Sequence, residues 1–204
     1  MSNRRLYLCL GLSESIADIT RAAIDGGVDV VQLREKTSEA QPIIASAVAI
    51  KEITDKNRVP FFINDRVDIA RVVGSDGVHL GQGDISPMDA RAMLSQNVII
   101  GRSTHAQSEL DAAQNEPVDY ISAGPIEATP TKPGRAPTGL SYLNYAVGHS
   151  KYPVFVTGGI TPAKIEELIP IGVSHFVVVR YIVDAKDAFR AARELRIAID
   201  RNFD

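Results

Sequence analysis

The 204-residue sequence predicts a (β/α)8 barrel formed by one domain over residues 1–204. Short apolar runs typical of buried strands alternate with amphipathic helical patterns along the chain. In addition, an acidic or hydroxyl residue precedes every second strand, at positions 29, 76, 119 and 174, which lie 47, 43 and 55 residues apart, or about two βα units. An open doubly wound sheet is the alternative, but this rhythm favours closure into a barrel.

The strands are expected where β-branched and aromatic residues gather. Eight such runs occupy residues 6–10, 28–33, 61–63, 77–80, 98–101, 120–123, 154–157 and 175–179. Between them, N-cap signatures predict helix starts at Ser38 with Gln41, at Ser86 with Pro87 and at Thr161 with Pro162. Glycines predict helix ends at positions 26–27, 74 and 172. The last helix is expected to bury one face, formed by Phe189, Ala192, Leu195 and Ile199.

Charge and composition limit the classes of molecule that the protein is expected to bind. A net charge of -3 and a pI near 5.8 give no general attraction to nucleic acid or to an anionic membrane. Cys9 is the only cysteine, so it forms no internal disulfide; we expect a buried small hydrophobe in a reducing cytoplasm. No apolar run is long enough for a signal peptide or a membrane span. Small anionic molecules are therefore the expected partners, and a homo-oligomer is left open.

The segment 124–139 interrupts the α/β pattern with prolines and glycines. Prolines remove backbone donors, which excludes a helix or an interior strand. Long loops of this kind usually bind a ligand or cover a site. This one carries groups that hold phosphate, namely Thr129, Thr131, Lys132 and Arg135.

Polar residues recur directly after the predicted strands, where barrel enzymes have their active sites. They are Gln32, Arg34, Lys36, Asn64, Asp65, His79, Gln82, Asp84, Ser103, His105, Gly158, Gly159 and Arg180. Strand alternation further predicts that Val31 and Leu33 face the helices, while Gln32 and Arg34 point into the barrel mouth.

Each of these residues also has a simpler interpretation. Asp65 could N-cap the following helix, Asp84 could be a turn residue, and Arg34 could pair with a surface carboxylate. His79, His105 and His175 are expected to be structural, because no two have the spacing of a helical metal pair. The recurrence of polar residues at one end of the strands favours a site, because independent structural roles would not all fall there.

The types of side chain predict the chemistry. Asp65 and Asp84 beside several cations suit Mg2+, which is typically held by one or two carboxylates together with substrate phosphates. Lysine and arginine around a departing diphosphate would neutralise its developing charge. A second anion would fit near Thr129, Thr131, Gly159 and Arg180, so two phosphorylated substrates are expected in one mouth.

Six ordered motifs over nearly the whole chain closely resemble the thiamine-phosphate synthase family. They are residues 32–36 (QLREK), 63–68 (INDRVD), 79–82 (HLGQ) with Asp84, 101–105 (GRSTH), 124–132 (GPIEATPTK) and 158–160 (GGI). The resemblance implies a (β/α)8 barrel that joins hydroxymethylpyrimidine diphosphate to thiazole phosphate with Mg2+ and releases pyrophosphate. It implies a dissociative mechanism through a pyrimidine cation, without a general base, and loss of carbon dioxide if the thiazole is carboxylated.

The resemblance also implies roles for individual residues. Pyrimidine diphosphate contacts fall on Gln32, Leu33, Arg34, Glu35, Lys36, Asn64, Ser103 and Lys132. Of these, the catalytic groups are Arg34, Lys36, Ser103 and Lys132. The Mg2+ ligands are Asp65 and Asp84. Thiazole phosphate contacts fall on Thr129, Pro130, Thr131, Gly159, Val179 and Arg180.

Two positions depart from the family pattern: Gly83 replaces an acidic residue common before the metal aspartate, and Arg180 replaces a frequent serine. Two relatives remain as alternatives. A thiazole tautomerase would lack the complete diphosphate and metal set and would carry histidine where this chain has Pro125. A non-catalytic protein that binds thiamine phosphates would have lost a metal carboxylate or Lys132, and both are present.

Overall fold

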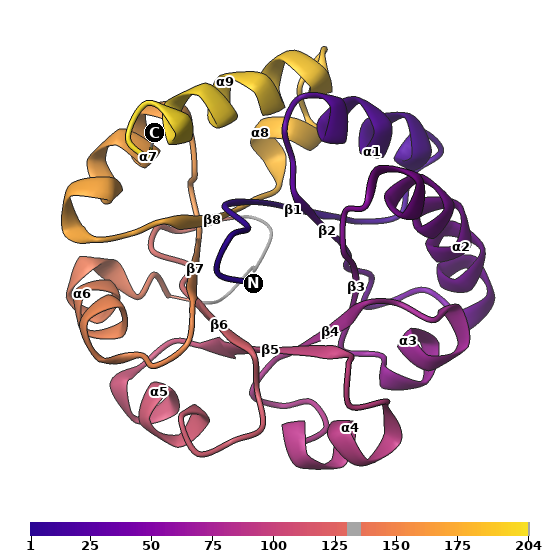
Figure 1. Cartoon of the computed structure of the whole chain (residues 1–204), viewed down its shortest axis with the longest axis horizontal. Helices are drawn as coiled ribbons and strands as arrows, with labels where there is room; N and C mark the ends of the chain where they lie inside the picture. The colour runs from indigo at the N-terminus through magenta and orange to yellow at the C-terminus, as the bar shows by residue number, and fades with distance from the viewer. Residues whose placement is uncertain (130–135, 204) are drawn as a thin grey trace.

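The predicted barrel is confirmed by a computed structural model, which describes residues 1–129 and 136–203. Eight parallel strands close into one ring, each paired with its neighbours in sequence and β8 paired with β1. The helices surround this ring, as the view down the barrel shows (Figure 1). Because every strand runs in the same direction, all their carboxyl ends open on one side of the molecule.

The strands agree with the sequence prediction except at their ends. They are β1 Leu6–Leu10, β2 Val30–Leu33, β3 Phe61–Asn64, β4 Gly77–Leu80, β5 Ile99–Thr104, β6 Tyr120–Ala123, β7 Val154–Thr157 and β8 His175–Val178. The largest difference is β5, which continues three residues beyond the predicted end at 101, through Arg102 and Ser103 to Thr104. This extension brings Ser103 into regular strand geometry.

The helices follow the strands in alternation. They are α1 Ile16–Asp25, α2 Ala40–Asn57, α3 Val67–Val73, α4 Pro87–Met93, α5 Gln107–Ala113, α6 Gly139–His149, α7 Pro162–Leu168, the 3-10 turn η1 Ile169–Ile171, α8 Arg180–Val183 and α9 Ala188–Asp200. The N-caps at Ser86 and Thr161 are confirmed, since each hydroxyl accepts a backbone N–H three residues on. The predicted cap at Ser38 is wrong: the N-cap is Glu39, without a side-chain capping bond.

Two layers of apolar side chains lie on opposite faces of the strands. Val31 and Leu33 belong to the large layer between strands and helices. The barrel interior is filled by a separate aromatic cluster of Tyr7, Val30, Phe62, Tyr120 and Phe155. This confirms the alternation predicted for β2 and makes the aromatic cluster the floor beneath the barrel mouth.

The repeated acidic positions cap strands at the amino-terminal end of the barrel. Asp29 accepts hydrogen bonds from the backbone N–H groups of Arg5 and Leu6 at the start of β1. Asp76 does the same for Phe61 in β3, and Asp119 for Ile100 in β5. A carboxylate before each of these even-numbered strands therefore satisfies a donor at the start of the preceding odd-numbered strand.

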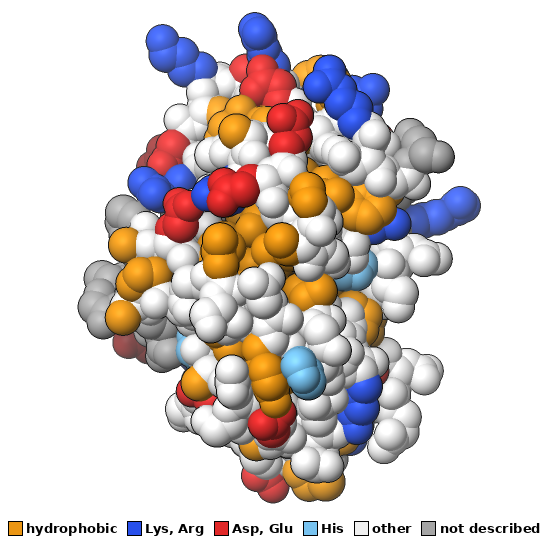
Figure 2. Space-filling model, turned by 90° about the vertical axis from the view of Figure 1, so that its left-hand side faces the viewer, with side chains coloured by type: hydrophobic (Ala, Val, Ile, Leu, Met, Phe, Trp, Pro, Cys, Tyr) orange, Lys and Arg blue, Asp and Glu red, His pale blue; other side chains and the backbone are white. Residues whose placement is uncertain are grey.

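The outer surface of the molecule is mixed in character. Figure 2 shows basic and acidic side chains close together near one end of the visible face, with hydrophobic side chains spread over its middle. In α9, Ala192, Leu195 and Ile199 are buried as predicted, but Phe189 is 46% exposed. Among the described residues, no helix combines the length and apolar character needed to cross a bilayer.

Candidate active site

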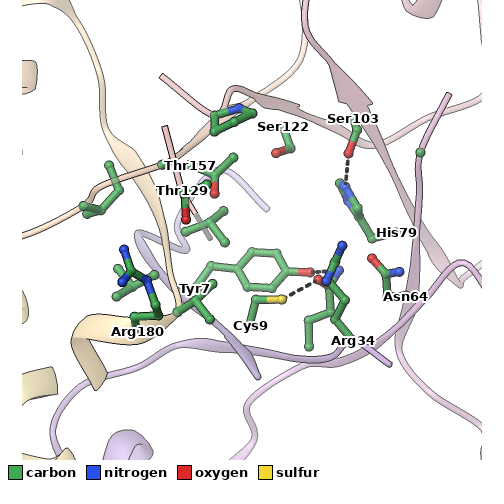
Figure 3. Close-up of a pocket in the computed structure, with 18 of the residues that line it drawn as sticks. Tyr7, Cys9, Arg34, Asn64, His79, Ser103, Ser122, Thr129, Thr157 and Arg180 are labelled. Atoms are coloured by element: carbon green, nitrogen blue, oxygen red, sulfur yellow. Dashed lines mark hydrogen bonds between the residues drawn. The ribbon is translucent and has the colours of Figure 1, made fainter. Parts of the chain in front are cut away.

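A cavity of about 640 Å3 opens at the carboxyl ends of the strands. Its lining includes the predicted site residues Gln32, Arg34, Lys36, Asn64, Asp65, Ser103, Thr129, Gly159, Val179 and Arg180. Figure 3 shows Arg34, Asn64, His79 and Ser103 at one end of the cavity and Thr129, Thr157 and Arg180 at the other, with the Tyr7 ring between them. Residues far apart in sequence thus form one two-ended site.

The first end of the cavity offers donors that no described residue uses. Arg34 forms no ion pair within residues 1–129 and 136–203, so the surface-pair interpretation of its guanidinium is not supported. The Asn64 side chain is buried, yet its Nδ2 has no hydrogen-bond partner among the described residues. A buried unpaired donor costs free energy, so Asn64 at the cavity wall indicates a ligand that accepts hydrogen bonds.

Asp65 is held toward this end by an uncommon backbone conformation. Its φ angle is 63°, in the left-handed region that non-glycine residues rarely adopt. Its carboxylate does not cap α3, whose N-cap residue is Arg66, but instead lies 2.7 Å from the Lys36 ammonium. Burial raises the pKa of Asp65, and the neighbouring Asp84 carboxylate raises it further. The two predicted metal carboxylates therefore lie close together.

Asp84 does not line the cavity itself. Its Oδ2 accepts a hydrogen bond from the Gly81 backbone N–H across 2.7 Å, as a turn residue would. Gln82 in the same loop donates to the Ser103 carbonyl at 2.7 Å and so ties the loop to β5. The turn and its attachment hold Asp84 next to Asp65, so the structural interpretation and the site are compatible.

The Asp65–Asp84 pair suits a hard divalent cation. Two neighbouring carboxylates gain from a shared cation, and Mg2+ commonly takes one or two carboxylates plus substrate phosphates. In the part of the chain that the structure describes, no three His, Cys, Asp or Glu side chains form a metal cluster. A cation held by these two carboxylates would complete its coordination with oxygen ligands from water or from a bound substrate.

Among the described residues of the predicted diphosphate set, two do not line the cavity. Leu33 packs in the layer beneath the helices. The Glu35 carboxylate accepts four hydrogen bonds, from the backbone N–H groups of Lys36, Thr37 and Ser38 and from the Thr37 hydroxyl. These bonds, led by those from Thr37, lower the pKa of Glu35 to about 2. Glu35 therefore shapes the loop that presents Lys36.

The second end of the cavity is built from loops after β6, β7 and β8. Gly158 and Gly159 both have positive φ angles, of 106° and 69°, so glycine allows this turn after β7. Arg180 begins α8 and forms no ion pair with any described residue. Of the loop after β6, Thr129 lines the cavity, whereas Pro130, Thr131, Lys132 and Arg135 lie outside the described residues. Thr138 closes the base of this loop by donating to the Pro125 carbonyl.

Several lining residues were not predicted as site residues. They include Tyr7, Cys9, Tyr120, Ser122 and Thr157. Cys9 is buried as expected, but it lies in the cavity wall and donates to the Gln32 side chain instead of packing as a plain hydrophobe. Alternation along β1 could have found Tyr7 and Cys9, because both share the inward face of that strand.

The three histidines that were expected to be structural differ in position. His175 packs on Phe155, and its Nδ1 pairs with the Arg4 carbonyl at the amino-terminal end of the barrel, which confirms a structural role. His79 and His105 instead line the cavity. His105 lies within 2.8 Å of Glu109, and His79 belongs to a hydrogen-bonded chain across the floor.

Comparison with known proteins gives a consistent result. Residues 6–182 match the family model described as thiamine monophosphate synthase. A thiamine-phosphate synthase of Thermus thermophilus is 44% identical over 198 residues, which cover 94% of this chain and 95% of that protein. The thiamine-phosphate synthase of Thermobifida fusca is 42% identical over 202 residues, covering 96% and 92% of the two chains.

A solved structure agrees in both fold and extent. The thiamine phosphate pyrophosphorylase from Pyrococcus furiosus superposes with a TM-score of 0.88 at 28% sequence identity. The alignment covers 98% of this chain and 97% of that one. The similarity therefore spans the barrel and the loops that form the cavity.

Proposed function

Because the chain belongs to the thiamine monophosphate synthase family, and is thus a transferase, we propose that it makes thiamine phosphate. The substrates are 4-amino-2-methyl-5-(diphosphooxymethyl)pyrimidine and 4-methyl-5-(2-phosphoethyl)thiazole or its 2-carboxy form. Pyrophosphate is the second product. A cytoplasmic location accompanies this proposal as a prediction.

The placement of two guanidinium groups carries the proposal. Arg34 and Arg180 lie at opposite ends of one cavity, and neither pairs with a described carboxylate. Guanidinium groups recognise phosphate oxygens through paired N–H donors. A cavity with an available cation at each end suits two phosphorylated substrates whose reactive carbon and nitrogen meet between those ends.

At the Arg34 end, the cations and neutral donors fit a diphosphate. Arg34, Lys36, Asn64 and Ser103 surround the space in which we place it, and Lys132 is added by the family resemblance alone. The side chain of Leu33 is excluded from contact, and Glu35 acts by shaping the Lys36 loop. Charge that develops on the departing diphosphate is neutralised by these groups without the reorganisation that water would need.

At the Arg180 end, neutral donors and the cation fit a phosphate monoester. We assign Thr129, Gly159, Arg180 and the Val179 backbone to the thiazole phosphate, with Pro130 and Thr131 added from the resemblance. Holding the thiazole at this end aims its ring nitrogen at the pyrimidine carbon as the diphosphate departs. The proximity of the two substrates replaces a bimolecular encounter.

We assign Asp65 and Asp84 as the residues that would hold Mg2+. The bound ion would supply charge neutralisation for the diphosphate and fix its orientation. Lys36 is paired to Asp65 at 2.7 Å and sits where it can turn toward the diphosphate once a divalent cation lies against the carboxylates. The bond-forming step needs no general base, since the thiazole nitrogen attacks without a proton to lose.

The deciding experiment combines purified protein, Mg2+, the pyrimidine diphosphate and the thiazole phosphate. Thiamine phosphate and pyrophosphate in equal amounts are expected, measured by chromatography and a coupled phosphate assay. Isomerisation of carboxylated thiazole phosphate without pyrophosphate would indicate the tautomerase instead. Binding of thiamine phosphate without turnover would indicate a regulatory relative, and either result would overturn the proposal.

A further inference from the structure

A hydrogen-bonded chain crosses the floor of the cavity through five strands. Cys9 Sγ lies 3.1 Å from Gln32 Oε1, and Gln32 Nε2 lies 3.0 Å from the Tyr7 hydroxyl. The Tyr7 and Tyr120 hydroxyls are 3.1 Å apart. The Tyr120 hydroxyl lies 2.9 Å from His79 Nδ1, and His79 Nε2 lies 2.8 Å from Ser103 Oγ. Figure 3 shows the last of these contacts reaching the cavity wall.

The middle of this chain is sealed from water. Tyr7 is 2% exposed and Tyr120 is fully buried. Burial is the main cause that raises the pKa of each phenol, so both remain protonated at any physiological pH. Each tyrosine therefore brings one proton to the chain and needs one acceptor for it.

Counting donors and acceptors gives the chain a direction. With the Gln32 amide donating to Tyr7, the Tyr7 proton must go to Tyr120, because a proton directed elsewhere would be buried without a partner. The Tyr120 proton then goes to His79 Nδ1. That leaves His79 with its proton on Nε2, from which it donates to Ser103 Oγ.

If every hydrogen bond in this chain were reversed, the bond between Gln32 and Cys9 would be weaker. The reversal would rotate the Gln32 amide so that its nitrogen donates to the Cys9 sulfur, a weak acceptor. In the observed orientation the weak S–H donor instead meets a strong carbonyl acceptor, and the amide N–H meets a phenol oxygen. The stronger pairings therefore favour the direction that runs from Gln32 toward Ser103.

We propose that Tyr7, Tyr120 and His79 are positioning residues that fix Ser103 as a hydrogen-bond donor toward the cavity. Because Ser103 Oγ accepts from His79, its own proton is available for a ligand oxygen. Gln32 Nε2 likewise keeps a second N–H after its bond to Tyr7. Asn64 Nδ2, which has no hydrogen-bond partner among the described residues, is a third neutral donor facing the same end of the cavity.

Nuclear magnetic resonance tests the direction of the hydrogen bonds in this chain without any substrate. Protein labelled with 15N-histidine is compared with the His79→Gln variant at about pH 8, above the ordinary imidazole pKa of about 6.5, to assign the His79 signals. We expect a protonated Nε2 and an unprotonated Nδ1. A proton on Nδ1, or an equal mixture of the two forms, would overturn the proposal. If His79→Gln fails to fold, variants at His105, His149 and His175 assign the other signals, and the signal that remains in the wild-type spectrum belongs to His79.

A double-mutant cycle tests the consequence for binding, and this part rests on the proposed function. Tyr120→Phe should raise the KM for the pyrimidine diphosphate about fivefold, the loss expected for about one hydrogen bond. In the Ser103→Ala background the same change should add less than about twofold, because its effect passes through Ser103. An equal further loss in that background would contradict the proposal.

Tyr142→Phe is the matched control. It also removes a buried tyrosine hydroxyl that bonds β5, at Thr104 Oγ1, but on the helix-facing side outside the chain. It should leave both the KM and the His79 tautomer unchanged. If the protein forms no product at all, the proposed function fails while the resonance result still decides the direction of the chain.

Discussion

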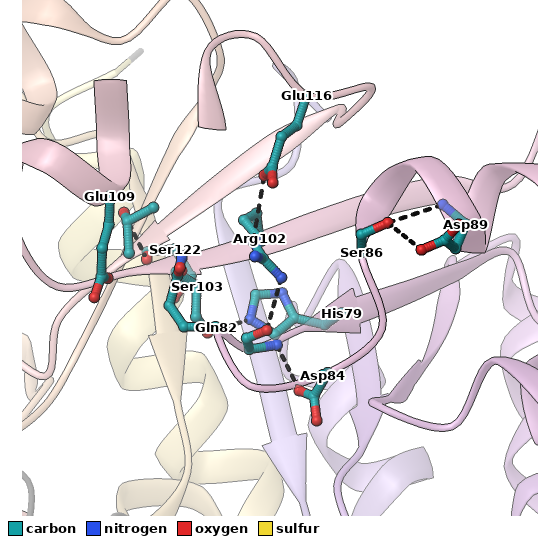
Figure 4. Close-up of polar contacts among 12 residues, drawn as sticks. His79, Gln82, Asp84, Ser86, Asp89, Arg102, Ser103, Glu109, Glu116 and Ser122 are labelled. Atoms are coloured by element: carbon teal, nitrogen blue, oxygen red, sulfur yellow. Dashed lines mark hydrogen bonds and ion pairs between the residues drawn. The ribbon is translucent and has the colours of Figure 1, made fainter. Parts of the chain in front are cut away.

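The guanidinium of Arg102 donates a hydrogen bond from Nη1 to the Gly81 carbonyl oxygen across 2.7 Å. Arg102 lies on the outward face of β5, nearly buried, with its Nε 3.3 Å from the Glu116 carboxylate (Figure 4). The Gly81 backbone N–H in turn donates to Asp84. Arg102 thus connects the loop that carries a proposed metal ligand to a rigid strand.

We expect Arg102→Met to loosen this loop. The free energy of unfolding should fall by about 1–3 kcal/mol, because a charged hydrogen bond is lost and Glu116 loses its partner. The Mg2+ concentration needed for half-maximal product formation should rise about 10-fold. Thermal unfolding and a Mg2+ titration of activity measure the two effects.

The control for Arg102 is Arg71→Met, which removes an exposed arginine bond to the Met93 carbonyl outside the site. Its Mg2+ requirement should match the wild type. Equal Mg2+ requirements in the Arg102 and Arg71 variants would show that Arg102 does not position the Asp84 loop.

The metal assignment predicts a second pair of variants. Asp65→Asn and Asp84→Asn should each lower product formation by about 100-fold or more, since each removes a negative ligand while keeping the shape of the side chain. Binding of Mn2+ to the substrate-free protein, followed by electron paramagnetic resonance, should weaken in parallel. Asp68→Asn is the control, because Asp68 pairs with Arg66 outside the cavity. Wild-type rates from both site variants would remove the assignment.

Much of the fold could be predicted because its signals are local. The strands alternate in polarity, and Ser86 and Thr161 precede prolines at helix starts, so element types and most boundaries followed from short windows of sequence. The predicted N-cap at Ser38 was wrong. The hydroxyl of Ser38 and its spacing to Gln41 resemble a cap, but Glu35 organises that turn and the helix begins later. The predicted end of β5 was too early, because polar residues continue this strand and are held in it by pairing with the neighbouring strand β6.

The candidate site was less accessible to sequence reasoning where partners come from distant segments. Tyr7 and Tyr120 resemble ordinary core aromatics, and their shared hydrogen bond joins residues 113 positions apart. The role of Arg102 depends on its contacts with the Gly81 carbonyl and the Glu116 carboxylate, which lie on other loops. By contrast Arg34 and Asn64 lie at the ends of strands, so the topology of a barrel alone placed them at the mouth.

The barrel interior leaves no room for a side chain at Gly101. A Cβ atom at this position would lie 2.1 Å from Tyr120 Cζ, so Gly101→Ala must displace the ring or the strand. We expect a loss of about 1–3 kcal/mol or more in the free energy of unfolding, measured by urea denaturation. Gly148→Ala, where a Cβ would meet nothing within 4 Å, is the control. A Gly101→Ala protein as stable as this control would show that the interior packing is looser than the structure indicates.

The four hydrogen bonds to Glu35 predict that its carboxyl group takes up a proton only at unusually low pH. Its pKa is lowered from the ordinary 4.5 to about 2 in the folded protein. A depressed carboxyl pKa means that the stabilisation is fully present above about pH 4.5 and is lost as the pH falls through about 2. Carboxyl 13C resonances should therefore show Glu35 titrating near 2.

Thr37→Val tests the cause of that low pKa. It removes the hydroxyl donor at 2.9 Å while leaving the backbone donors of the loop in place, so the Glu35 pKa should move upward toward 4.5. The Lys36 ammonium is carried by the same loop, so the KM for the pyrimidine diphosphate should rise as the loop loosens. A Glu35 resonance that titrates near 4.5 in the unmodified protein would show that the carboxylate does not hold the loop in solution.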